Sequence, residues 1–123
     1  MNQMTDKIRL IGLSFYGYHG VSSSEQETGR MYEVDCELEA DLSQAGKTDN
    51  LEHTINYESV YLTIKALVEN KKYFLLEKLA EEISQKILDK FTINQVTLRI
   101  RKMNPPIAGH IQAVEVEICR QQK

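Results

Sequence analysis

The sequence predicts an α+β fold in which four antiparallel strands form one sheet and two helices cover one of its faces, in the order β-β-α-α-β-β. Two observations support this prediction. The spacing of the apolar residues changes along the chain from strand-like alternation to helical spacing and back, and each predicted strand is apolar on one side only. One-sided strands favour an antiparallel sheet whose apolar face is covered by helices.

The first two strands are read from alternation. Residues 8–15, IRLIGLSF, alternate loosely and have the β-branched and aromatic bias of a strand. Residues 32–41, YEVDCELEAD, alternate strictly, with an acidic residue at every second position. The apolar side of this segment is formed by Val34, Cys36, Leu38 and Ala40. A strand with one buried face has this pattern.

Two helices follow. The first is expected to begin at Tyr57, with Asn56 as its N-cap, because Val60, Ile64 and Val68 recur at helical spacing. The second is predicted over residues 75–91, LLEKLAEEISQKILDKF. Its apolar stripe consists of Leu75, Leu76, Leu79, Ala80, Ile83, Ile87 and Phe91.

Alternation then returns in two further strands. Val96, Leu98 and Ile100 oppose Thr97, Arg99 and Arg101, and Val114, Val116 and Ile118 oppose Glu115 and Glu117. The polar side of the sheet therefore carries acidic rows and arginines, for which cross-strand ion pairs are the simplest explanation. The outer strands leave unpaired backbone groups, and closure into a ring of subunits would remove these edges. We therefore expect an oligomer.

The composition indicates a single globular domain over residues 1–123, with residues 1–5 as a flexible N-terminal extension. A net charge of −3 argues against electrostatic binding of nucleic acid. Neither a membrane span nor the apolar region of a signal peptide is visible. The cysteines and histidines show no metal-binding spacing. We therefore expect a cytoplasmic protein with no metal cofactor and no nucleic-acid or membrane partner.

The connection between the first two strands, FYGYHGVSSSEQETG over residues 15–29, is longer than a hairpin requires. Loops of this length are often either functional or disordered. Glu25 is its most interesting residue and has two readings, a solvated loop carboxylate or a group facing a pocket. Gly17 and Gly20 are expected to permit positive φ in the turn.

Two further residues are candidates for chemistry. Glu77 falls in the first turn of the second helix, where a carboxylate either complements the helix dipole or grips a flat hydrogen-bond donor beside free backbone N–H groups. Lys102 shares the parity of the apolar side of its strand and is expected to project toward the helices. It is either a lysine that snorkels at the strand end or a group for proton transfer whose pKa is lowered by apolar surroundings.

Four stretches together identify a family. The sequence resembles dihydroneopterin aldolases over nearly the whole chain, through FYGYHG followed by a glutamate, then TDNLEHTINY, LLEKLAEEI and RKMNPP, in the order and spacing of that family. The resemblance implies the tunnelling fold, in which four subunits form a ring and two rings stack into a homo-octamer. It also implies active sites at the interfaces between subunits.

The resemblance assigns roles to seven residues. Glu77 matches the glutamate that anchors the pterin ring, and Leu76 beside it supplies backbone contacts. Lys102 matches the catalytic lysine, and Glu25 the glutamate that meets the hydroxylated side chain of the substrate. Tyr57 matches a tyrosine that reaches in from a neighbouring subunit. Two further residues are expected to line the pocket, namely Ile55 and Val21.

The implied reaction is retro-aldol cleavage of 7,8-dihydroneopterin, with epimerase side activity and without metal or Schiff base. The C=N bond of the dihydropterin accepts the electrons of the breaking bond, so the protein has only to orient the ring and move protons. Two alternatives stay open: a dihydroneopterin or dihydroneopterin triphosphate epimerase, and a non-catalytic protein that binds a pterin or purine. The segment VSSSEQE lacks the basic residues that a triphosphate would favour.

Overall fold

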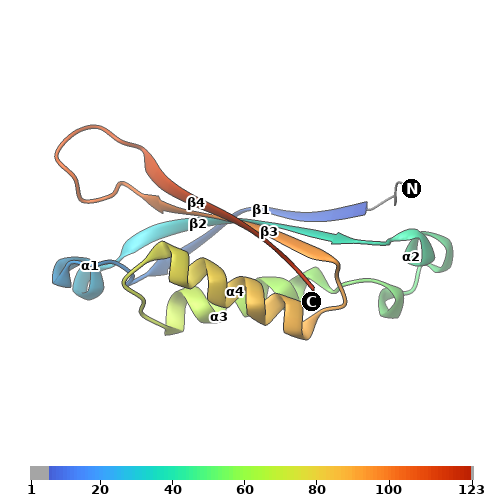
Figure 1. Ribbon diagram of the computed structural model, residues 1–123. Coiled ribbons are helices and arrows are strands. Elements are labelled where there is room, and N and C mark those ends of the chain that lie inside the picture. Colours follow the sequence, from blue (N-terminus) through green and yellow to red (C-terminus); the bar gives the residue numbers. More distant parts are fainter. Residues whose placement is uncertain (1–5, 123) are drawn as a thin grey trace.

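The computed structural model describes residues 6–122, so the predicted flexible extension at residues 1–5 lies outside the described residues. The predicted β-β-α-α-β-β order and the antiparallel sheet are confirmed. The sheet has the order β1-β2-β3-β4 and consists of β1 (Asp6–Gly17), β2 (Arg30–Ala40), β3 (Gln95–Met103) and β4 (Ala113–Gln121). Two long helices, α3 (Tyr57–Asn70) and α4 (Leu76–Lys90), lie side by side on one face of it (Figure 1). Within the described residues, no helix is long and apolar enough to cross a membrane.

The connections contain short helices that the sequence analysis does not predict. These are α1 (Ser23–Thr28), α2 (Ser43–Thr48) and the 3₁₀ turn η1 (Leu51–His53). Figure 1 shows α1 and α2 at opposite ends of the sheet. A helix of six residues makes fewer than two turns and presents no apolar stripe, so hydrophobic periodicity could not reveal it.

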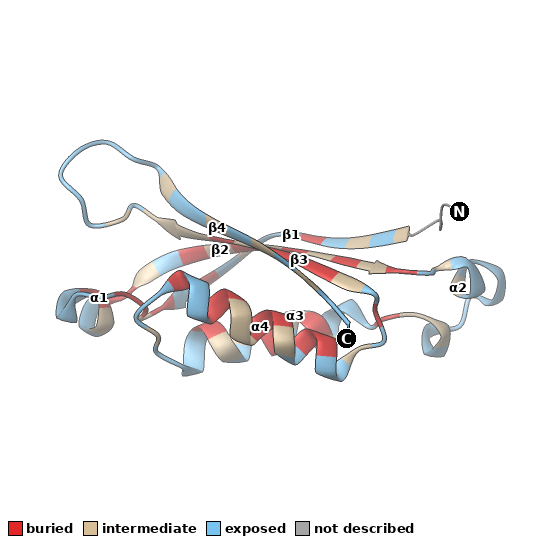
Figure 2. Ribbon diagram, in the orientation of Figure 1, coloured by how far each residue is buried: buried red, intermediate tan, exposed pale blue. Residues whose placement is uncertain are grey.

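The core lies between the sheet and the two long helices. The predicted apolar sides of β2 and β3 are buried, as are the facing residues of α3 and α4 (Figure 2). Side chains with no exposed surface include Tyr32, Val34, Leu38, Val60, Ile64, Leu79, Ile83, Ile87, Leu98 and Ile100. Each such side chain contributes on the order of 1.5–3 kcal/mol by its transfer from water.

The loose alternation in β1 has a structural cause. The register against β2 shifts between Leu10 and Leu13, and Gly12 within this bulge has φ of 72°. The backbone N–H of Gly12 donates to Oδ1 of Asp35 at 2.8 Å. The bulge turns Ile11 outward, where it is exposed, so strict alternation is lost at that point.

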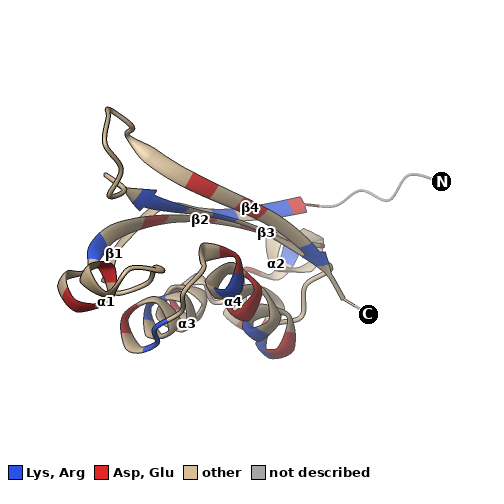
Figure 3. Cartoon of the chain, turned by 60° about the vertical axis from the view of Figure 1, so that its left-hand side comes forward, with Lys and Arg blue, Asp and Glu red and all other residues tan. Residues whose placement is uncertain are grey.

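The other face of the sheet carries the expected cross-strand ion pairs. Figure 3 shows basic and acidic positions on neighbouring strands of the sheet. The guanidinium of Arg101 donates to both carboxylate oxygens of Asp35 at 3.0 Å and also contacts Glu115. Arg99 donates to Glu117 at 2.6 Å, and Arg9 to Glu37 at 2.8 Å. These pairs account for Asp35 and Glu37 in the acidic row of β2.

Candidate active site

A buried ion pair joins two of the predicted site residues. The Nζ atom of Lys102 donates to Oε2 of Glu25 at 2.7 Å, and the side chains are only 13% and 7% exposed. Lys102 pairs across the sheet with Tyr32, whose side chain is fully buried under the helices. The predicted direction of Lys102 is therefore confirmed. Its surroundings are not simply apolar, because a carboxylate meets its ammonium group.

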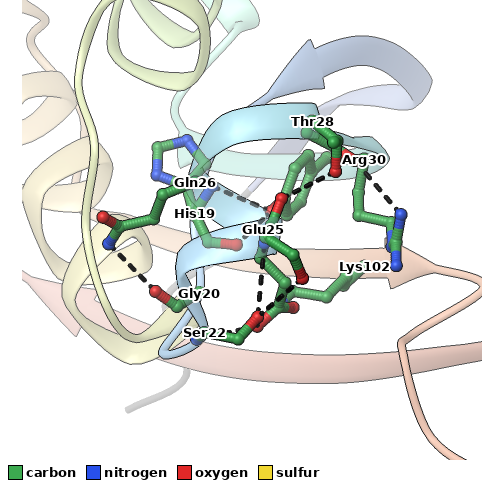
Figure 4. Close-up of polar contacts among 11 residues, drawn as sticks. His19, Gly20, Ser22, Glu25, Gln26, Thr28, Arg30 and Lys102 are labelled. Carbon is green, nitrogen blue, oxygen red and sulfur yellow. Dashed lines mark hydrogen bonds and ion pairs between the residues drawn. The ribbon is translucent and has the colours of Figure 1, made fainter.

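Glu25 is not a solvated loop residue but the third residue of α1, and Ser22 holds it in place. The hydroxyl of Ser22 accepts from the backbone N–H of Glu25 at 3.2 Å and donates to Oε1 of the same residue at 3.2 Å. The backbone N–H of Ser22 lies 3.4 Å from that oxygen, which completes a capping box. Figure 4 shows Glu25 between Ser22 and Lys102. The carboxylate is thus held from two sides.

These contacts decide the charge of Glu25. Burial alone would raise the pKa of its carboxyl group, but the hydrogen bond and charge of Lys102, together with the bonds from Ser22, outweigh burial and lower the pKa below its ordinary value. Glu25 is therefore ionised at neutral pH and faces the ammonium group of Lys102. The two groups form a paired proton acceptor and donor within one protomer.

Only one of the two glycines expected to adopt positive φ does so. Gly20 has φ of 150°, whereas Gly17 is not among the positive-φ residues, so that expectation is wrong for Gly17. A Cβ atom at Gly17 would lie 3.0 Å from the carbonyl oxygen of Val68 and 3.1 Å from the ring of His19. Close packing of β1 against the end of α3 is therefore the reason for glycine at this position.

Replacement of Gly20 by alanine is expected to destabilise the fold and displace Glu25. A Cβ atom there would clash with Oε1 of Glu25 and would lie 2.8 Å from its Cβ atom, and φ of 150° strains any L-residue with a side chain. We expect the free energy of unfolding to fall by roughly 1–3 kcal/mol, measured by urea denaturation. Gly46→Ala is the matched control, because a Cβ atom at Gly46, within α2, meets nothing within 4 Å. Equal stability of the two variants would contradict the prediction.

Glu77 lies in the first turn of α4, as predicted, and its side chain is exposed. Leu76 before it is 8% exposed and belongs to the core. The N-cap residue Leu75 supplies no side-chain hydrogen bond, so the first N–H groups of α4 are not capped by a side chain. A carboxylate beside uncapped backbone donors suits a flat ligand that offers both donors and acceptors along one edge.

The loop before α4 joins this region to the Glu25–Lys102 pair. The backbone N–H of Tyr73 donates to Nδ1 of His19 at 3.1 Å, and the N–H of Gly20 donates to the carbonyl of Tyr73 at 2.9 Å. The start of α4 is therefore tied to the connection that carries Glu25. Val21, in the same connection, is 73% exposed.

Ile55 and Tyr57 do not join this group within one chain. Tyr57 is the first residue of α3, and Val68, near the other end of that helix, accepts a hydrogen bond from the ring of His19. At 1.5 Å per residue, Tyr57 lies roughly 16 Å along the helix from Val68. Ile55 is 8% exposed and packs in the core, whereas Tyr57 is 67% exposed. Within one protomer the predicted site residues therefore fall into two separate groups.

The sequence analysis missed three residues that shape the site. Ser22 could have been found, since Ser22-Ser23-Ser24-Glu25 matches the S-x-x-E pattern of a capping box. His19 and Tyr32 gave no local signal, because their partners are distant in sequence. Burial lowers the pKa of His19, the hydrogen bond to Val68 raises it, and the charge of Lys102 lowers it, with a net downward shift.

Comparison with known proteins gives a consistent result. The family model described as FolB, dihydroneopterin aldolase, matches residues 8–119. The dihydroneopterin aldolase of Bacillus subtilis is 46% identical over 116 residues, which is 94% of this chain and 97% of that protein. The dihydroneopterin aldolase of Streptococcus pyogenes serotype M1 is 44% identical over 117 residues, covering 94% and 98% of the two chains.

Among solved structures, this chain is similar to E. coli dihydroneopterin aldolase in complex with neopterin. The TM-score is 0.87 and the sequence identity is 26%, over 94% of this chain and 98% of that chain. The bound molecule of that crystal structure has a pterin ring with a hydroxylated side chain.

Proposed function

This chain belongs to the dihydroneopterin aldolase family, and from that premise we propose that residues 1–123 form one such domain, which in folate biosynthesis cleaves 7,8-dihydroneopterin in the cytoplasm. The products are 6-hydroxymethyl-7,8-dihydropterin and glycolaldehyde. The buried ion pair of Glu25 and Lys102, tied through the Tyr73 loop to the start of α4, is the observation that best supports this proposal. A pterin-binding protein without activity would not need such a pair.

In this proposal Glu77 binds the pterin ring. Its carboxylate accepts from the amino group and a ring N–H of the pterin, and this paired, charge-assisted contact orients the ring. The uncapped backbone N–H groups at Leu76 and Glu77 donate to acceptor atoms on the same edge. Ile55 and Tyr57 of a neighbouring subunit line the pocket, and Val21 lies at its mouth. The hydroxylated side chain of the substrate then points toward Glu25.

Cleavage moves two protons and one electron pair. The hydroxyl on the second side-chain carbon loses its proton, the bond between the first and second carbons breaks, and glycolaldehyde leaves. The electron pair of that bond passes into the ring C=N bond, whose nitrogen takes a proton. In our assignment Lys102 supplies that proton through bound water, Glu25 orients the hydroxyls, and Tyr57 relays protons at the side-chain end. Return of a proton to the first carbon, with loss of the one on nitrogen, completes the product.

The test is incubation of the purified protein with 7,8-dihydroneopterin, with the products resolved by chromatography. We expect hydroxymethyldihydropterin and glycolaldehyde, with a smaller amount of the epimer. Formation of the epimer alone would favour the epimerase, which shares the enamine intermediate. A protein that forms neither product would overturn the assignment of activity.

The assembly is predicted to be a ring-built homo-octamer of two stacked tetramers. The open edges of β1 and β4 and the separation of Tyr57 from Lys102 within one chain support this prediction. Light scattering is expected to give about eight times the chain mass of 14.2 kDa. A fully active monomer would contradict it.

Mixed oligomers would test the shared site directly. In a random mixture of Tyr57→Phe and Lys102→Met subunits, a site built from two subunits is intact in roughly a quarter of cases, because each contributor is correct half of the time. Co-expression of the two variants should therefore restore about a quarter of wild-type activity, although each variant alone is impaired. If mixing restored nothing, both residues would have to act within one chain.

A further inference from the structure

His19 is a buried, titratable side chain to which the proposed reaction assigns no part. It has no exposed surface, and both nitrogens of its ring are hydrogen-bonded. Because the backbone N–H of Tyr73 can only donate, the Nδ1 atom of His19 must accept from it, at 3.1 Å. The proton of the neutral ring then lies on Nε2, which donates to the carbonyl oxygen of Val68 at 2.8 Å.

The backbone of His19 is held as firmly as its ring. The hydroxyl of Tyr32 donates to the carbonyl oxygen of His19 at 2.7 Å and accepts from its N–H at 3.1 Å. Tyr32 is also the cross-strand partner of Lys102. One tyrosine therefore connects the strand position of the catalytic lysine with the backbone of the segment that leads to Glu25.

On its other side, His19 is connected to the segment that leads to Glu77. The rings of His19 and Tyr73 stack, with their centroids 5.7 Å apart and their planes inclined by 13°. Both backbone groups of Tyr73 form hydrogen bonds to the connection between β1 and β2, the N–H to the ring of His19 and the carbonyl to the N–H of Gly20. Four residues after Tyr73 lies Glu77, at the start of α4. We call His19, Tyr32 and Tyr73 the His19 cluster.

We propose that His19 is a positioning residue, which fixes the distance between the Glu25–Lys102 pair and Glu77. The inference rests on the proposed function, in which Glu77 binds the ring of the substrate and Glu25 meets its side chain. A ligand that spans both ends needs the two segments at the correct separation, whereas a ligand that consists of the ring alone needs only the start of α4. Loss of the cluster should therefore weaken the binding of ligands that span both ends and leave the binding of ring-only ligands largely unchanged.

The test compares two non-reacting ligands, pterin, which has only the ring, and neopterin, which has the ring and the hydroxylated side chain. In His19→Asn, the amide oxygen can still accept from Tyr73, but the ring stack and the bond to Val68 are lost. We expect the affinity for pterin to stay within about threefold of wild type. The affinity for neopterin is expected to fall toward that for pterin, and kcat for 7,8-dihydroneopterin to fall roughly 10- to 100-fold, since a misplacement of about 1 Å can cost 100-fold.

Controls separate positioning from general damage. His110→Asn replaces an exposed histidine in the connection between β3 and β4 and should change none of these values. Tyr32→Phe removes a single oxygen and should repeat the selective loss, and it decides the question if His19→Asn fails to bind either ligand. Two results in Tyr32→Phe and in folded His19→Asn would overturn the proposal. One is an equal loss of affinity for pterin and neopterin, and the other is an unchanged kcat. A wild-type protein that fails to cleave 7,8-dihydroneopterin would instead overturn the proposed function.

Discussion

Lys102→Met is expected to reduce the turnover of 7,8-dihydroneopterin by roughly 10²–10⁴-fold, the usual contribution of a general acid–base group. The lysine is proposed to act on protons that move during bond cleavage, and in this proposal it reaches the ring nitrogen only through bound water. The affinity for neopterin should therefore stay close to that of wild type. Single-turnover rates and equilibrium titration with neopterin would measure the two effects separately.

A matched control is available on the surface of the same chain. Lys65 also pairs with a glutamate, Glu69, at 3.0 Å, but this pair lies on the exposed side of α3. Exposed ion pairs of this kind contribute about 0–1 kcal/mol to stability, so Lys65→Met should leave turnover unchanged. Near-normal turnover in Lys102→Met would return the lysine to a structural role, and Tyr57 would become the first candidate for the proton transfers.

Because Lys102 is paired with Glu25, the Lys102→Met variant also changes the surroundings of that carboxylate. A double variant can separate the two effects. Without the lysine, Glu25 keeps its burial, which raises its pKa, but loses the strongest of the contacts that lower it. If the two groups act as one unit, the double variant Glu25→Gln, Lys102→Met should cost little more than either single change. Additive losses would indicate that the two groups act in separate steps.

The fold could be predicted from the sequence largely because its core elements have a regular local signal. The strict alternation of β2 corresponds to a buried face, and so does the apolar stripe of α4 from Leu76 to Ile87. The two ends of the predicted stripe differ, because Leu75 is the exposed N-cap of α4 and Phe91 is its partly buried C-cap. The bulge at Gly12 and the short helix α1 were missed, since neither is long enough to set up a period. Local sequence thus determined the layers, while the departures from regularity depend on tertiary contacts.

The candidate site was harder to predict from the sequence, for a related reason. The Glu25–Lys102 pair joins residues 77 positions apart, and the ring of His19 reaches Val68, 49 positions away. The alternation of side chains along its strand correctly predicted that Lys102 points toward the helices. It could not show which group the lysine would contact. The roles proposed for Ile55 and Tyr57 involve a second chain, which no periodicity within one sequence can describe.

Glu77→Gln is expected to weaken pterin binding by roughly 30- to 5,000-fold, equivalent to about 2–5 kcal/mol when a charged pair is fully desolvated by its ligand. The amide keeps the shape of the side chain but replaces one acceptor oxygen with a donor, which would face the amino group of the pterin. Titration with neopterin and with pterin should show equal losses, because both ligands carry the ring that Glu77 binds.

At saturating substrate, kcat of Glu77→Gln should change far less than affinity. The ring edge held by Glu77 is remote from the bond that breaks, so the contact stabilises substrate and transition state almost equally and acts mainly on KM. Glu82→Gln is the control on the same helix, because Glu82 is paired with Lys78 at 3.8 Å and has no proposed ligand contact. A large loss in kcat with unchanged neopterin affinity would place Glu77 in the chemical step, and the anchor of the ring would then have to be sought among the backbone groups at the start of α4.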